Sequence, residues 1–529
     1  MSAKRWVYAV WLALIFAFAA VHALHLQADF PNHSPWTSDW AKYTDEGWYG
    51  NAAVRAHLFG NWYVPGDFNP APAVPLWPFL EWALFSCTGV KVEAARALAV
   101  AFFLMELWLS YLLLRVRGSR WMALLAITLA VTSPFLYSFS RLAILEPMLV
   151  TFFLAGLNLA VRLERFRRPV AVSAVTGLLF TMMLLTKTTA VFLLPALAWA
   201  LLAPLRGDWR KALRCATAAA AAAAVTFGAW MALVVQQGLL GDYNYLFFIN
   251  KYTKPTEWYW PLLSFWWSVK GSLWADRLLI PLAGSILLAA AMAWRSRWAR
   301  GLWGNPVFGA SALAVAGYIL FMTYQNHPQP RYYVVVALFS FFVLALGTEA
   351  LLQGWAGGGL RDAREAWRLI PAAAVLGAIV VVAVFNGVRT LECVTHPEYT
   401  FVNAARNLTR YIDEHPNGRR MLVSISGDEI SMITHLPALC DDFGTLDLPD
   451  KLANYQPGWW ATWNDIDPGT LEDLHLHYSL EQVAGFRAFD DPERNVLVLF
   501  KLHPLAKARE DTPALQQPQP EDRIAIPVE

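Results

Sequence analysis

Eleven stretches of mostly apolar residues recur along the first 386 residues of the chain. A helix that crosses a bilayer needs about 20 such residues, because every backbone polar group in lipid must be satisfied inside the helix itself. The sequence therefore predicts an α-helical polytopic membrane protein with about 11 transmembrane helices. The expected spans are 6–26, 92–114, 121–139, 142–161, 169–186, 188–205, 215–236, 277–294, 305–324, 333–352 and 369–386.

Charge divides the chain into a basic body and an acidic tail. From Gly387 onward there are 23 acidic and 12 basic residues, whereas the rest of the chain has a net charge of +13. The basic residues of the body gather in every second loop, which the positive-inside rule places in the cytoplasm. We therefore expect an inner (plasma) membrane protein with a cytoplasmic N-terminus and an extracytoplasmic C-terminal domain. Since the positive charge is confined to short loops, membrane lipids are expected partners and nucleic acid is not.

The pattern predicts three regions. Residues 1–386 form the transmembrane module, which includes a long outer loop at 27–91. Residues 387–506 alternate helical and extended patterns, typical of a small α/β domain, with helices at 400–414 and 428–439 and strands at 421–426 and 495–502. Residues 507–529 are rich in Pro and Gln and are expected to be disordered.

Two cysteines, Cys393 and Cys440, fall in the region expected outside the cytoplasm. A disulfide between them is allowed in an oxidising compartment, and the sequence leaves it open.

The outer loops carry two further patterns. Within the first, Trp48, Ala52, Arg55 and Phe59 recur at helical spacing, which predicts a helix over 45–59 lying on the membrane surface. The second outer loop, 237–276, is rich in Trp and Tyr. Those aromatic residues fit either an interfacial belt or contacts to sugar and lipid.

Ionisable residues gather at the outer ends of the predicted spans, where they are a functional hypothesis by default. Each of these residues also fits a purely structural role. Asp45 and Glu46 could cap a helix, Lys187 could snorkel from a helix end, Arg141 and Glu146 could form a structural ion pair, and Arg331 could be a flanking charge. Their shared depth on one side of the membrane favours a common site. These residues are Asp45, Glu46, Arg141, Glu146, Lys187 and Arg331, with Tyr332 and Tyr333 beside the last.

Such a set supplies what sugar transfer from a lipid phosphate needs. A carboxylate can take the proton of an attacking acceptor, and cations can stabilise the leaving phosphate. A second carboxylate can orient the acceptor or hold a divalent cation. A divalent cation is therefore left open as a cofactor, and the metal residues are unassigned.

The order of these features resembles the GT-C glycosyltransferases, and most closely the family of protein O-mannosyltransferases and lipid A aminoarabinose transferases. In that family, an Asp-Glu-x-x-Tyr motif lies on an outer helix after the first span, and further short motifs follow it in a fixed order. This chain has matching segments in the same order within residues 1–352. The matching segments are Asp45-Glu46-Gly47-Trp48-Tyr49, Pro75-Leu76-Trp77, Gly89-Val90 with Ala94-Ala95-Arg96, Arg141 with Glu146-Pro147, Thr186-Lys187 and Arg331-Tyr332-Tyr333.

The resemblance implies a role for each residue. Asp45 would be the catalytic base, with Glu46 beside it in the catalytic pair. Glu46, Glu146 and Tyr49 would shape the acceptor or metal site. Lys187, Arg331 and Arg141 would bind the donor phosphate, and Tyr332 and Trp77 would contact the donor or lipid. The implied reaction is inverting transfer from a polyprenyl-phosphate sugar to an extracytoplasmic lipid, glycan or protein.

Two departures from the family pattern concern substrate identity. The family often has Lys-Pro-Pro-Leu where this chain has Ala73-Val74-Pro75-Leu76, so one phosphate-binding cation is missing. The arginine that follows Asp-Glu in the aminoarabinose transferases is replaced by Trp48. Both changes argue against lipid A as the acceptor.

Two other functions are weighed against a transferase. A transporter or flippase of lipid-linked sugars would place polar groups near the bilayer midplane and show internal repeats, and we find no repeat. A membrane scaffold with an extracytoplasmic binding domain would leave the Asp45-Glu46 pair unexplained.

Overall fold

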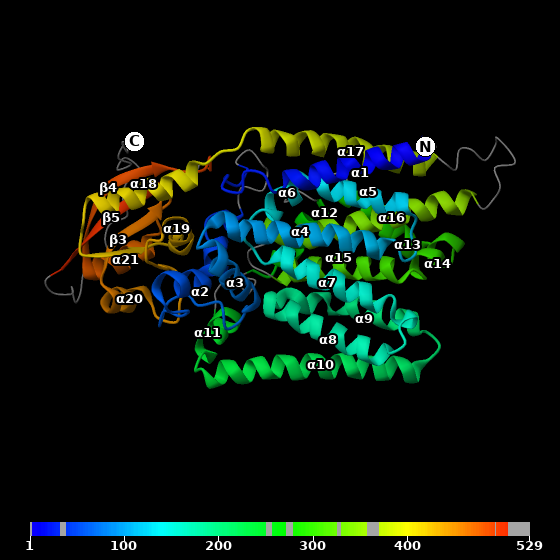
Figure 1. Ribbon diagram of the computed structural model, residues 1–529, viewed down its shortest axis with the longest axis horizontal. Coiled ribbons are helices and arrows are strands. Elements are labelled where there is room, and N and C mark those ends of the chain that lie inside the picture. The colour runs from blue at the N-terminus through cyan, green and yellow to red at the C-terminus, as the bar shows by residue number, and fades with distance from the viewer. Residues whose placement is uncertain are drawn as a thin grey trace. The chain divides into compact units, whose positions relative to one another are not determined.

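The computed structural model describes residues 3–31, 39–249, 257–270, 279–324, 329–356, 370–491 and 494–505. The described chain is mostly helical and ends in a small sheet (Figure 1). Its transmembrane-type and connecting helices are α1 (Ala3–Val21), α4 (Val92–Leu114), α5 (Arg120–Thr132), α6 (Pro134–Ser140), α7 (Glu146–Ala160), α8 (Pro169–Thr186), α9 (Leu194–Leu202), α10 (Trp209–Gln236), α12 (Trp260–Lys270), α13 (Leu279–Met292), α14 (Arg297–Trp303), α15 (Pro306–Tyr324), α16 (Tyr333–Ala356) and α17 (Ile370–Thr395).

The remaining elements surround the sheet or precede it in the chain. They are α2 (Asp45–Phe59), α3 (Leu76–Thr88), α11 (Leu240–Asn244), α18 (Thr400–Glu414), α19 (Gly427–Thr434), α20 (Leu448–Tyr455) and α21 (Pro468–His477), with strands β1 (Arg419–Val423), β2 (Ala438–Leu439), β3 (Pro457–Trp463), β4 (Tyr478–Arg487) and β5 (Val496–Pro504).

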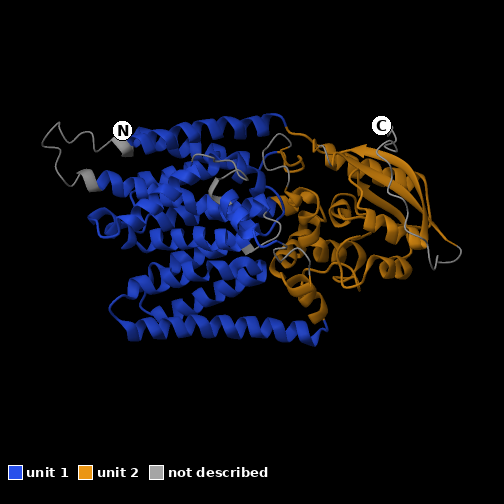
Figure 2. Ribbon diagram, turned by 180° about the vertical axis from the view of Figure 1, so that it is seen from behind, with its two compact units in different colours: residues 1–24, 97–238, 250–396 blue, residues 25–96, 239–249, 397–529 orange. Residues whose placement is uncertain are grey.

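The chain separates into two compact units, drawn in different colours in Figure 2. Unit 1 comprises residues 1–24, 97–238 and 250–396, and unit 2 comprises residues 25–96, 239–249 and 397–529. The long outer loop that the sequence shows between the first two spans therefore folds together with the C-terminal domain. We describe each unit by itself.

Unit 1 is a bundle of apolar helices. Among the described residues, seven helices are long and apolar enough to cross a membrane, or nine if each of two bent helix pairs counts as one span. The shorter apolar helices Arg5–Val21 and Glu146–Ala160 lie at the first and fourth predicted spans. Each of the eleven predicted stretches thus contains a helix of one of these kinds, which confirms the predicted membrane fold.

Burial differs strongly among these helices. Helix α16 packs against α5, α13 and α15 and is buried along most of its length. Helix α10 packs mainly against α8, and most of its side chains are exposed. An apolar helix that is exposed in this way is expected to face lipid.

Unit 2 is built on a five-stranded mixed sheet of order β2-β1-β3-β5-β4. Strand β1 pairs in parallel with β2 and β3, whereas β5 runs antiparallel to both β3 and β4. Because successive side chains of a strand point to opposite faces, Trp459 packs with α18 and Trp460 packs with α20 and α21. The domain is therefore a three-layer α/β fold, which confirms the predicted class.

Some predicted boundaries in this domain are wrong. The helix predicted over 428–439 ends at Thr434, because His435 adopts a left-handed conformation (φ 65°) and the chain then enters β2. The strand predicted over 421–426 is β1 at Arg419–Val423. Strands β3 and β4 and helices α3, α20 and α21 were not predicted, whereas α18 has the predicted bounds.

Three predictions concern other segments. All four cysteines are free, so Cys393 and Cys440 do not form the disulfide that the sequence left open. The predicted disordered tail, 507–529, lies outside the described residues, as do positions 277–278 and 369 of two predicted spans.

Candidate functional site

Helix α2 carries the Asp-Glu pair at its first two positions. It begins at Asp45 and ends at Phe59, the range that the helical spacing predicts, and Gly60 closes it in a left-handed conformation. Both acidic side chains are buried, Asp45 at 2% exposure and Glu46 at 0%. The Thr44 hydroxyl donates a hydrogen bond to Asp45 Oδ1 at 3.2 Å. The Asp45-Glu46 pair of the sequence motif is thus buried inside unit 2.

Arg96, at the start of α4, binds Glu46 with two parallel hydrogen bonds. Its Nε and Nη2 atoms lie 2.8 and 2.5 Å from the two carboxylate oxygens of Glu46. Arg96 Nη1 also donates to the carbonyls of Leu26 and Ala28, each at 2.8 Å. A bidentate, charge-assisted pair of this kind fixes both side chains in one geometry. Glu46 is therefore committed to Arg96, which holds the first turn of α2.

Two further buried carboxyl groups lie beside this pair. Glu81, on α3, has Trp77 and Glu46 as neighbours, and Glu429, on α19, has Glu46 and Asp45. Burial, with a smaller contribution from the charge of Glu46, raises the pKa of both groups well above the usual range. Burial thus favours the protonated form of both groups, which limits the negative charge beside Glu46.

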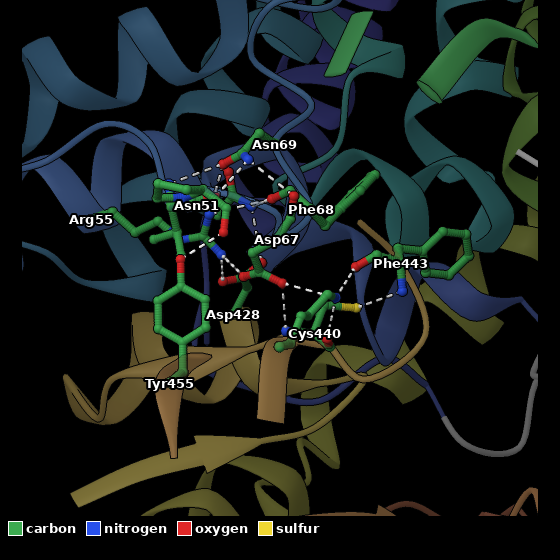
Figure 3. Close-up of polar contacts among 12 residues, drawn as sticks. Asn51, Arg55, Asp67, Phe68, Asn69, Asp428, Cys440, Phe443 and Tyr455 are labelled. Atoms are coloured by element: carbon green, nitrogen blue, oxygen red, sulfur yellow. Dashed lines mark hydrogen bonds and ion pairs between the residues drawn. The ribbon is translucent and has the colours of Figure 1, made fainter. Parts of the chain in front are cut away.

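The middle of α2 is anchored by a buried charge network (Figure 3). Arg55 Nη2 lies 2.7 Å from Asp67 and 3.0 Å from Asp428, and Asn51 Nδ2 donates to Asp428 at 3.0 Å. Burial raises the pKa of Asp428 to about 6, and the nearby Asp67 charge adds to this while Arg55 opposes it. The helix face that contains Arg55 is thus covered by protein within unit 2.

Lys451, on α20 of the C-terminal domain, adds a second cation to the network. Its Nζ atom lies 3.3 Å from Asp67 Oδ1 and 2.7 Å from the carbonyl of Cys440, whose own backbone N–H donates to Asp67 at 3.0 Å. Two buried cations therefore match the carboxylates Asp67 and Asp428. The outer loop and the C-terminal domain share one polar core.

Asp441, which follows Cys440 in the chain, is a buried acid whose protonation should make the stability of the protein depend on pH. Burial raises its pKa to about 7, while the indole N–H of Trp460 donates to it at 3.2 Å. In the unfolded chain the Asp441 carboxyl has a pKa of about 3.9 and releases its proton above that pH, whereas the folded protein keeps the proton. The free energy of unfolding therefore falls as pH rises from about 4 to about 7. Asp441→Asn cannot ionise, so its thermal midpoint is expected to rise relative to that of the native protein between about pH 5 and about pH 7.

The control for that comparison is Asp413→Asn. Asp413 is exposed and its pKa is lowered by its hydrogen bond to Arg420, so its ionisation lies below this pH window. Its midpoint should keep a constant offset from the native value across the window. Parallel curves for Asp441→Asn and the native protein would refute the assignment of Asp441 as a buried, protonated acid.

In unit 1 the predicted donor-side residues meet around Tyr332. Lys187 forms a buried ion pair with Glu146, and its ammonium lies 4.7 Å from the centre of the Tyr332 ring. The guanidinium of Arg331 lies 4.9 Å from the centre of the same ring. Lys187 and Glu146 are paired, and Arg331 is the second cation beside the Tyr332 ring. The structure thus brings together Glu146, Lys187, Arg331 and Tyr332 from distant parts of the sequence.

Arg141 has different partners. It donates to the hydroxyl of Tyr137 and, at 2.7 Å, to the carbonyl of Leu24, and it lies over the Tyr137 ring. The structural pair with Glu146 that the sequence left open is not formed, because Glu146 binds Lys187 instead. Tyr49 is half-buried on α2, and Trp77 is fully buried beside Glu81.

Sequence reasoning missed several residues of these groups. Arg96 stands in the quoted Ala-Ala-Arg motif, where an arginine that enters an apolar span signals a buried partner. Asp67, Asp428, Glu429 and Lys451 give no local signal, because they meet only after the outer loop folds with the sheet domain. Among the residues that the structure describes, no three His, Cys, Asp or Glu side chains are arranged to hold a metal ion. We therefore derive no step through a metal.

Part of the sequence, and the fold of the chain, are similar to those of known membrane glycosyltransferases. Residues 70–231 match the family model described as dolichyl-phosphate-mannose-protein mannosyltransferase. No curated protein matches the chain in sequence.

Two solved structures show the similarity in three dimensions. The ArnT protein of Cupriavidus metallidurans, bound to undecaprenyl phosphate, aligns with a TM-score of 0.61 at 14% identity, over 94% of this chain and 98% of ArnT. The oligosaccharyltransferase AglB of Archaeoglobus fulgidus, in complex with an inhibitory peptide and a dolichol-phosphate, aligns with a TM-score of 0.53 at 11% identity, over 94% of this chain and 74% of AglB. These comparisons confirm the resemblance and the fold class, and they agree with the prediction of a glycosyltransferase.

Proposed function

We propose that this protein transfers a sugar from a polyprenyl-phosphate donor to an acceptor outside the cytoplasm. The observation that carries the proposal is the buried Asp45-Glu46 pair at the start of α2, clamped by Arg96, in a chain with the GT-C fold. A scaffold would have no use for a buried acid fixed in this way. The lipid carriers bound to ArnT and AglB support a lipid-linked donor.

Asp45 is the general base of the proposed reaction. The acceptor hydroxyl or amine attacks the anomeric carbon, the bond from that carbon to the phosphate oxygen breaks, and the acceptor proton passes to the Asp45 carboxylate. Attack opposite the leaving phosphate inverts the anomeric configuration. Glu46, paired with Arg96, keeps Asp45 at the start of the helix. The proposed role of Tyr49, one turn further along α2, is to help shape the acceptor site.

The Tyr332 group of unit 1 receives the donor phosphate. As the phosphate leaves it gains negative charge, which Arg331 and Lys187 offset, while Glu146 holds Lys187 in place. Arg141 adds a third cation, and the partly exposed ring of Tyr332 offers aromatic surface to the sugar or lipid. The proposal also includes the inner (plasma) membrane, a cytoplasmic N-terminus and an extracytoplasmic C-terminal domain, as the basic loops predict.

The test is sugar transfer by purified protein in lipid, with a panel of polyprenyl-phosphate sugars. Asp45→Asn keeps the shape of the side chain but removes its basicity, so turnover is expected to fall by about 10²–10⁴-fold with donor binding retained. The matched control, Asp413→Asn, removes an exposed carboxylate of the same unit and should leave turnover unchanged. Full turnover by Asp45→Asn would remove Asp45 from the role of base.

A further inference from the structure

Glu429 brings a carboxyl group from the C-terminal domain to the start of α2. It lies in the first turn of α19, is 1% exposed, and has Asp45 and Glu46 of α2 and Arg96 of α4 as its charged neighbours. The neighbouring Asp428 on the same helix points instead to Arg55 and Asn51. The two consecutive acids of α19 therefore contact two successive parts of α2.

The backbone of α19 is fixed against α2 at close range. A Cβ atom at Gly47 would lie 2.1 Å from the backbone nitrogen of Glu429, and one at Gly50 would lie 2.9 Å from the end of Met432. His435, which ends α19, has its Nε2 atom 3.1 Å from the carbonyl of Val90. Glycine at position 47 is thus what lets the backbone of α19 touch the first turn of α2.

Among its charged neighbours, Glu46 is the one to which the carboxyl of Glu429 can donate a hydrogen bond. Glu46 already accepts two hydrogen bonds from Arg96, and no donor among the described residues reaches either oxygen of Glu429. A buried acid without donors is favoured in its protonated form, and a protonated Glu429 directs its one proton to Glu46. Glu46 is then held from two sides, by an arginine and by a neutral acid.

We infer that Glu429 is a positioning residue of the transferase site, which acts through Glu46 on the first turn of α2 and hence on Asp45. This inference rests on the proposed function. It gives the C-terminal domain an indirect part in the reaction, because α19 of that domain packs against the first turn of α2. Glu429 itself does not touch the reacting atoms.

The test compares Glu429→Gln with Glu429→Met in the full-length protein. The two side chains are similar in size, but only the amide can donate a hydrogen bond to Glu46. The glutamine variant is expected to keep kcat within about 3-fold of the native value, and the methionine variant to lose about 10-fold or more. The donor KM should stay the same in both, since the proposed donor phosphate site is the Tyr332 group and does not include Glu429.

The outcomes separate this inference from the proposed function. Equal kcat values for the two variants, whether native-like or reduced, would overturn the role of Glu429 while transfer by the native protein still stood. Absence of transfer by the native protein would overturn the proposed function itself. Thermal midpoints are measured for both variants, and a lower kcat for the methionine variant at an unchanged midpoint supports positioning rather than folding.

Discussion

Arg55→Ala is expected to destabilise unit 2 by about 3–5 kcal/mol, the cost of breaking a buried ion pair from one side. Arg55 is 3% exposed, and its removal leaves Asp67 with Lys451 and the backbone N–H of Cys440, and Asp428 with the amide of Asn51. The carboxylates can lower this cost only by taking up protons, so the loss should be larger above about pH 7 than at about pH 5. Thermal or chemical unfolding of the purified protein in lipid measures it.

Arg420→Ala is the matched control for that prediction. Arg420 also pairs with an aspartate, Asp413, in the same unit, but both side chains are about half exposed. Exposed pairs contribute roughly 0–1 kcal/mol, because water and salt screen them. Equal losses for the two arginine variants would contradict the buried network as the element that joins the outer loop to the sheet domain.

Gly47→Ala is expected to force α19 away from α2 and to destabilise the unit by about 3 kcal/mol, the upper part of the range for overpacking. The new methyl group would meet backbone atoms of Asp428 and Glu429, which cannot rotate away as a side chain would. The variant should also lose transferase activity, because Glu429 moves with α19. The measurements are the unfolding midpoint and turnover.

Gly241→Ala controls for the change from glycine to alanine itself. Gly241 lies in α11 of the same unit, and a Cβ atom there would meet nothing within 4 Å. Alanine favours a helix over glycine by up to about 1 kcal/mol, so this variant should be neutral or slightly more stable. A Gly47→Ala protein as stable and active as Gly241→Ala would show that the close contact of α19 with α2 is not needed.

The membrane fold could be predicted because lipid imposes a simple rule on sequence. A helix that crosses the hydrocarbon region makes all its backbone hydrogen bonds internally and must be long and apolar. Such segments can be recognised in the sequence without knowledge of the tertiary structure. Helix α18 was equally clear, since Phe401, Leu408 and Ile412 form one apolar face. Strand β3 was missed because both its faces are buried, so that Trp459 and Trp460 stand side by side without any polar alternation.

The candidate site was predictable only in part, for a different reason. Asp45 and Glu46 stand in a motif, and Lys187 and Arg331 are charges at span ends, so each is visible locally. Their partners are set by tertiary structure: Glu46 binds Arg96, and Lys187 binds Glu146. Glu429 belongs to a short amphipathic helix whose pattern carries no sign of a catalytic site. The contribution of the C-terminal domain therefore became visible only from the fold.

The most direct test of the central claim follows the labelled sugar of a polyprenyl-phosphate donor in vesicles that contain the native protein. The account predicts that the sugar leaves the lipid and appears on an acceptor or in water, with release of the polyprenyl phosphate, and that Asp45→Asn stops this while still binding the donor. If the donor stays intact and instead crosses the bilayer when the protein is present, the protein is a transporter of lipid-linked sugars and the transferase account is wrong.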